Sequence, residues 1–192
     1  MSSMKNSEEW KSNKKFIWIS FILGFIFLFF SMKYLFSELP NKQNIHEIKG
    51  IFKEIKVNKE KRGGKSLTIH VKEYPEINFM IGSIAIKQMY FQRFMAENKP
   101  GDSVTFFIEK HEYNRKIIKS ETIPFPENFL SRNNISIVEI HKKNTKYLSL
   151  NNYNEAHQNN NLLAILFFGG LGILMIWLGI KSINYYKTSH KQ

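Results

Sequence analysis

The amino-acid sequence predicts a membrane protein in which two transmembrane α-helices flank a β-rich α+β domain. Long apolar runs lie near both ends of the 192-residue chain, while the middle alternates apolar and polar residues with the period of two that is typical of half-buried strands. The mean hydropathy of -0.32 is therefore an average over unlike parts. The chain has no cysteine, which excludes disulfides, thiolate nucleophiles and cysteine-ligated metal sites.

Two apolar runs, residues 16–36 and residues 162–180, are the predicted transmembrane helices. The first contains 21 residues and a single charge, Lys33, which lies near its end, where the side chain can reach the lipid headgroups. The second contains 19 residues and no charge. At 1.5 Å per residue such helices are about 31 and 28 Å long, close to the ~30 Å thickness of the hydrocarbon core of a bilayer. Both runs are therefore long enough to span a membrane.

The first apolar run also has to be compared with a cleaved signal peptide. Lys14 and Lys15 precede it, as a basic n-region would. The run is longer than the roughly 7–15 residues of a signal-peptide h-region, and no small-x-small cleavage site follows it. We therefore expect an uncleaved signal anchor.

Lysines near the ends of the two runs predict the orientation, because basic flanks stay in the cytoplasm. Lys11, Lys14 and Lys15 precede the first run closely, and Lys181, Lys187 and Lys191 follow the second. We expect cytoplasmic tails at residues 1–15 and 181–192 and an extracytoplasmic domain at residues 37–161. The abundance of Lys, Asn, Ile and Phe indicates an AT-rich bacterial genome. We therefore expect the protein to lie in the plasma (inner) membrane of a bacterium. The opposite orientation stays open because the domain itself is basic, with 20 Lys and Arg against 14 Asp and Glu.

Small residues in the two runs offer surfaces on which the helices can pack closely. They are Ser20, Gly24, Gly169, Gly170 and Gly172. Helices in membranes associate through such residues. Mere tolerance of glycine in membrane helices is the equally good alternative, because no GxxxG motif is present.

Three strands are predicted in the first half of the domain. Residues 48–57 have a strand-like composition, and a turn-rich stretch separates them from residues 66–74, in which apolar and polar residues alternate. These two strands form a predicted hairpin. Residues 78–81 are a third, short strand.

One helix and three further strands complete the predicted domain. Residues 84–98 have apolar residues at i, i+4 and i+8, which predicts a helix. Residues 102–109 alternate again, and residues 135–140 and 146–150 are candidate strands. The order strand, strand, strand, helix, strand, strand is that of a small five-stranded Greek-key barrel of the OB-like type, although another compact antiparallel sheet with one helix would give the same order.

Two stretches of the domain lack a periodic pattern. Residues 110–134, with Pro124 and Pro126, are predicted to form a long loop, and such loops often carry function. Residues 151–161 are rich in asparagine. They are either a polar linker or the first turns that lead into the second long helix.

The most basic stretch lies at the predicted hairpin turn. Its candidate anion-binding residues are Lys59, Lys61, Arg62 and Lys65. Such a cluster can bind lipid headgroups or an acidic polymer, at about 1 kcal/mol per charge near an anionic surface. A solvated hairpin tip is the alternative. No block of like charges predicts nucleic-acid binding.

No pattern typical of catalysis or metal binding is present. The six histidines form no HxH or HxxxH pair, and the chain has no nucleophile elbow. The apolar runs contain no acid, histidine or arginine, which argues against a proton relay or an ion path. We therefore predict no catalytic residue, no metal and no cofactor.

Two short motifs accompany the layout of the chain. Gly50-Ile51-Phe52 opens the first predicted strand, and Lys99-Pro100-Gly101-Asp102 leads a later one. With a helix at each end of a small β domain, the chain resembles two-pass bacterial membrane proteins in families of unknown function. The resemblance implies an envelope location and no particular activity, and it carries no functional residue over.

These observations favour a non-enzymatic envelope protein whose domain binds a partner protein, in an assembly, protective or immunity-type role. The first alternative is a domain that binds an anionic polymer or lipid headgroups through the basic hairpin tip. The second is a membrane-bound hydrolase. We expect the lipid bilayer and a protein as partners, and no nucleic acid. Whether the protein forms a homo-oligomer stays open.

Overall fold

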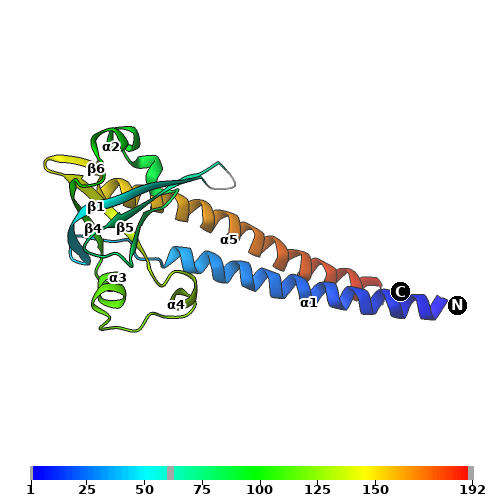
Figure 1. The fold of residues 1–192 in the computed structure, drawn as a ribbon. Coiled ribbons are helices and arrows are strands. Elements are labelled where there is room, and N and C mark those ends of the chain that lie inside the picture. The colour runs from blue at the N-terminus through cyan, green and yellow to red at the C-terminus, as the bar shows by residue number, and fades with distance from the viewer. Residues whose placement is uncertain (1, 60–62, 190–192) are drawn as a thin grey trace. The chain divides into compact units, whose positions relative to one another are not determined.

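A computed structural model describes residues 2–59 and 63–189 of the chain (Figure 1). The chain divides into two compact units. One comprises the chain up to Glu38 together with the chain from Asn159 onward, and the other comprises Leu39–Gln158. Two long apolar helices thus flank a β-rich domain, as the sequence predicts.

The first unit is helical. Helix α1 covers Ser2–Leu35, and helix α5 covers Leu150–Ser189, of which the part from Asn159 onward belongs to this unit. The stretches Asn13–Leu35 and Leu150–Tyr185 are long and apolar enough to cross a membrane. Only 11% of the most apolar window of each stretch is buried, so the protein itself does not cover these side chains.

Small residues lie where α1 and α5 pack together within this unit. A Cβ atom added to Gly24 would lie 2.7 Å from Ile176 Cγ1, and one added to Gly172 would lie 2.8 Å from Leu28 Cγ. Both distances are too short, so only glycine fits. The Ser31 hydroxyl donates to the Ile165 carbonyl oxygen at 3.2 Å. Gly24 and Gly172 therefore serve close packing, the first of the two interpretations of the sequence, whereas a Cβ atom at Gly170 would meet nothing within 4 Å.

The second unit is built on six strands. They are β1 Ile45–Lys59, β2 Lys65–Val71, β3 Asn78–Ile81, β4 Ser103–Glu109, β5 Asn134–Lys142 and β6 Thr145–Leu148. Their order is β3-β2-β1-β4-β5-β6, and β3 also pairs with β5 in parallel. This pairing closes β1, β2, β3, β5 and β4 into a five-stranded barrel. The closed barrel agrees with the OB-like expectation.

Strand β1 takes part in both halves of the barrel. Its first part pairs with β4, and its second part pairs with β2. The register of the β1–β2 pair shifts between Phe52 and Glu54. Such an irregularity bends a strand and increases its twist, which allows one long strand to curve around the barrel.

Apolar side chains from alternate strand positions fill the barrel. The alternation predicted for β4 is confirmed, because Val104, Phe106 and Ile108 are buried and the residues between them are not. In β2 the apolar residues Leu67, Ile69 and Val71 are buried as predicted, but Ser66 and Thr68 are buried as well. The rings of Phe79 and Phe106 meet edge to face, with centroids 4.7 Å apart. Phe94 contacts Phe52 and Tyr147 in the same manner at 5.9 and 5.2 Å.

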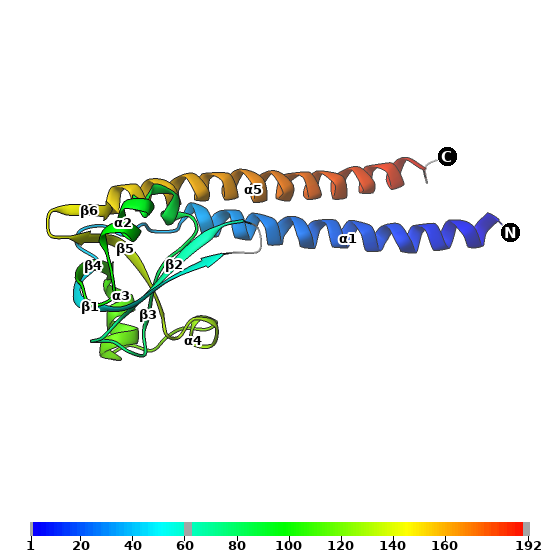
Figure 2. The same cartoon turned by 45° about the horizontal axis from the view of Figure 1, so that its top comes forward.

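The single helix predicted at residues 84–98 is wrong, because the structure has two short helices there. The 3-10 helix η1 covers Ala85–Gln88, and α2 covers Phe91–Glu97. Met89 between them is extended and buried, and the Tyr90 N–H donates to the Tyr147 carbonyl oxygen of β6 at 2.9 Å. Helix α2 lies beside β6 in both views (Figure 2). This hydrogen bond to β6 therefore takes the place of a helical one at Tyr90.

The loop predicted at residues 110–134 contains short helices instead. They are α3 at Lys110–Glu112, the π-helix η2 at Tyr113–Ile118 and α4 at Glu127–Leu130. Each is too short to leave a periodic pattern in the sequence. The asparagine-rich stretch is helical and forms early turns of α5, which confirms the second interpretation of residues 151–161.

Candidate functional site

The structure describes only part of the predicted basic site at the β1–β2 hairpin. Lys59 and Lys65 are exposed and lie directly opposite each other in the strand register, while Lys61 and Arg62 lie outside the described residues. The Lys65 ammonium lies 5.8 Å from the centroid of the Phe91 ring. Like charges that face each other across a strand pair repel, so an anion at this place would relieve the repulsion.

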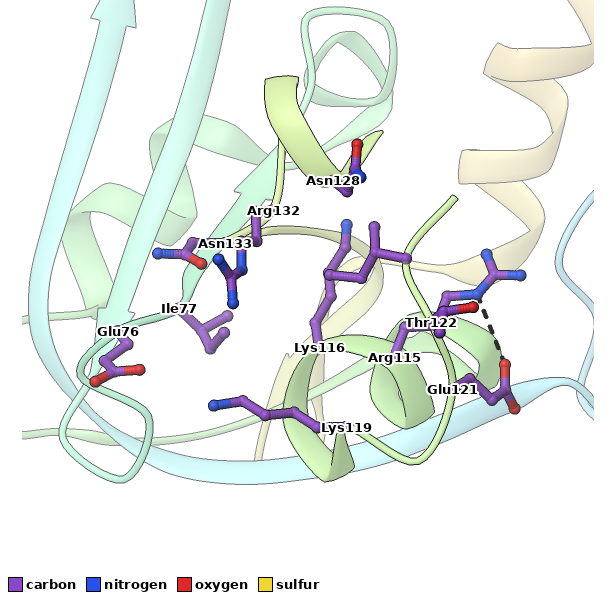
Figure 3. A pocket seen from close by; sticks show the side chains of 11 residues that line it. Glu76, Ile77, Arg115, Lys116, Lys119, Glu121, Thr122, Asn128, Arg132 and Asn133 are labelled. Carbon is purple, nitrogen blue, oxygen red and sulfur yellow. Dashed lines mark ion pairs between the residues drawn. The ribbon is translucent and has the colours of Figure 1, made fainter. Parts of the chain in front are cut away.

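A cavity of about 580 Å³ lies between the β2–β3 turn and the β4–β5 segment, by which we mean residues 110–133 (Figure 3). Glu76 and Ile77 line it from the turn. The β4–β5 segment supplies the other lining residues: Arg115, Lys116, Lys119, Glu121, Thr122, Ile123, Asn128, Arg132 and Asn133. Four cationic and two anionic side chains thus line the cavity.

The π-helix η2 brings three of the cations to this cavity. Arg115 and Lys116 lie on η2, and Lys119 is the residue that ends it. Lys119 has a positive φ of 60° and donates its backbone N–H to the Asn114 carbonyl oxygen. Wide π turns and left-handed residues other than glycine both occur preferentially at functional sites.

Lys116 is buried and serves the structure of the segment. Its ammonium contacts a carboxylate oxygen of Glu112 at 2.9 Å and one of Glu127 at 2.6 Å, and it donates to the Asn134 carbonyl oxygen at 2.6 Å. The other oxygen of Glu112 accepts the Ser136 N–H at 2.9 Å. These contacts tie η2 and α4 to the start of β5 and enclose the Lys116 ammonium among three protein oxygen atoms.

The charged groups around the rest of the cavity divide into paired and unpaired ones. The Arg115 guanidinium lies 3.6 Å from the Glu121 carboxylate, which also accepts a hydrogen bond from Asn114. Within the described part of the chain, Lys119, Arg132 and Glu76 have no ion-pair partner. In Figure 3 the Lys119 ammonium and the Arg132 guanidinium extend from different sides toward the space beside Ile77.

The same segment carries exposed apolar side chains. Phe125 is 85% exposed, Phe129 84% and Leu130 70%. We call these three residues the apolar surface of the β4–β5 segment. Large side chains of this kind are normally buried, and a group of them at a surface marks a place of interaction.

Few features of the sequence predict the cavity and the neighbouring apolar surface. Lys119 and Arg132 stand 13 positions apart in a segment without periodicity, so only the fold brings them together. The usable signals were the length of the connection and the aromatic and proline residues within it. Among the described residues, no group of three or more His, Asp or Glu side chains is placed to hold a metal ion.

No model of a known protein family matches the chain, and no curated protein is similar to it in sequence. The function must therefore be inferred from the surfaces and the cavity of the domain.

Proposed function

We propose that this protein is a non-enzymatic membrane-anchored protein whose domain binds a partner protein through the apolar surface of the β4–β5 segment. The observation that carries the proposal is the exposure of Phe125, Phe129 and Leu130. Burying one such side chain at an interface contributes roughly 1.5–3 kcal/mol. Buried aromatic residues commonly dominate the energy of protein interfaces.

The anchors of the proposed protein are α1 and α5, which would cross the plasma (inner) membrane of a bacterium. Their length and hydropathy support this, and the lysines outside both apolar stretches favour cytoplasmic termini. The domain would then lie outside the cytoplasm. An assembly, protective or immunity-type role fits such an arrangement, because it places a binding domain where it meets other envelope proteins.

Site-specific photo-cross-linking in intact cells tests the proposal. We expect a photoreactive amino acid at Asn128, an exposed position on α4, to form an adduct with one protein, which mass spectrometry identifies and which binds again when both are purified. The variant F125S/F129S/L130S should lose this adduct. The variant V57S/Y90S, which removes exposed apolar side chains elsewhere on the domain, is the matched control and should keep it.

Two results would count against the proposal. One is an adduct that persists in the triple variant, and the other is an adduct that consists of lipid alone.

The opposed pair Lys59 and Lys65 favours a second candidate, in which the hairpin binds an anionic polymer or lipid headgroups. Under this candidate the variant K59S/K61S/R62S/K65S loses its ligand, whereas the triple variant keeps it.

A further inference from the structure

We infer that the cavity between the β2–β3 turn and the β4–β5 segment binds a phosphorylated polyol, such as a sugar phosphate or a glycerol phosphate. Its phosphate would lie between Lys119 and Arg132, and its hydroxyl groups would contact the remaining polar side chains. This site differs from the apolar surface, and the inference does not depend on the proposed partner protein.

The phosphate is assigned from the unpaired cations. Lys116 is buried and contacts Glu112, Glu127 and the Asn134 carbonyl oxygen, so it holds the cavity wall in place. Lys119 and Arg132 have no ion-pair partner among the described residues, and both extend toward the same space (Figure 3). A guanidinium and an ammonium together suit a phosphate, since arginine offers a planar pair of donors and lysine a compact charge.

The uncharged polar side chains of the cavity, together with Glu76, are the reason for proposing a polyol. The side chains of Thr122, Asn128 and Asn133 line the cavity, and no hydrogen bond from them is found within the described chain. Glu76 would repel a bare anion, but its carboxylate can accept hydrogen bonds from hydroxyl groups. A ligand that carries both a phosphate and hydroxyls therefore suits the lining better than inorganic phosphate does.

The size of the cavity agrees with this class of ligand. Its volume of about 580 Å³ falls within the range of roughly 300–1,000 Å³ that is typical of small-molecule sites. Ile77 and Ile123 supply apolar contacts for the carbon skeleton of the ligand.

Calorimetric titration of the full-length protein in a neutral detergent tests the inference. The probes are glucose 6-phosphate, glycerol 3-phosphate, inorganic phosphate and glucose, at constant ionic strength. We expect saturable binding of the two polyol phosphates, weaker binding of inorganic phosphate and no binding of glucose.

Matched variants locate the binding. In K119S/R132S, affinity for glucose 6-phosphate should fall by about tenfold or more, because two charged hydrogen-bond donors are lost. The control K72S/K87S removes the same charge from exposed positions outside the cavity and should bind as the unmodified protein does. Glu76→Ala should weaken glucose 6-phosphate relative to inorganic phosphate.

The source of the polyol phosphate can be tested in nanodiscs. If it is a lipid headgroup, phosphatidylglycerol should compete with glucose 6-phosphate, whereas phosphatidylserine, which has the same charge without the glycerol headgroup, should compete less. If it is a free solute, the two lipids should compete with glucose 6-phosphate to the same extent. Three results overturn the inference. They are no saturable binding of either polyol phosphate, an equal loss of affinity in K72S/K87S and K119S/R132S, and binding of inorganic phosphate that is tighter than binding of the polyol phosphates.

Discussion

Lys116 joins three separate parts of the chain in and beside the β4–β5 segment. Its side chain is only 1% exposed, and its acceptors come from residues 112, 127 and 134. Nothing in the sequence marks this lysine among its neighbours, because its partners are set by the path of the segment. A buried charge with three acceptors is stable only while all of them stay in place.

Replacing Lys116 by Met should lower the free energy of unfolding by roughly 3–5 kcal/mol, because Glu112 is left buried without a counter-charge. Thermal unfolding of the full-length protein in detergent measures the loss, and limited proteolysis should show earlier cleavage within residues 110–133. Lys119→Met is the control, since this exposed residue has no ion pair to lose. Equal stability of the two variants would contradict this role of Lys116.

At the scale of elements, the period-2 pattern predicted the strands well, and the period-3.6 pattern predicted residues 84–98 less well. Strand β3 matches its predicted range, and β4 begins one residue later than expected. The predicted helix is interrupted at Met89 and Tyr90, where a hydrogen bond to Tyr147 competes with the helical one. Local periodicity contains no information on such a partner 57 residues away.

The contact between α1 and α5 can be tested with a disulfide, because the chain has no cysteine of its own. A Cβ atom added to Gly169 would lie 3.9 Å from Ser31 Cβ, within the usual Cβ–Cβ range of a disulfide. We therefore expect the variant S31C/G169C to form an intramolecular disulfide under mild oxidation.

The control for this experiment is S31C/G170C. A Cβ atom at Gly170 would have no neighbour within 4 Å, so this variant should stay reduced under the same conditions. Non-reducing electrophoresis after protease digestion between the helices distinguishes the two forms. Equal cross-linking in both variants would contradict the helix contact.

At the scale of the whole molecule, the sequence predicted two long apolar helices, a β-rich domain between them and an OB-like order of strands. It could not predict the parallel pair of β3 and β5, because pairing between distant strands leaves no local pattern. Nor could it predict the cavity, whose residues come from two connections that only the closed barrel brings together. The predicted basic site and the observed cavity share no residue.

Reporter fusions test the proposed orientation. An alkaline phosphatase fused after Asn114 should be active, because the domain is expected outside the cytoplasm, and the same reporter fused after Gln192 should be inactive. A fluorescent protein that folds only in the cytoplasm should give the opposite pattern at the two positions. An Asn114 fusion that fluoresces would reverse the orientation proposed here.

The parallel pair of β3 and β5 also sets the earliest point in synthesis at which the barrel can close. Asn78 pairs with Asn134, 56 residues later in the chain, whereas the β1–β2 hairpin joins close neighbours and is expected to form early. A chain that stops before β5 leaves β3 and β4 with unpaired edges, which are templates for aggregation. A ribosome that stalls before residue 134 would therefore release an aggregation-prone fragment instead of a smaller working domain.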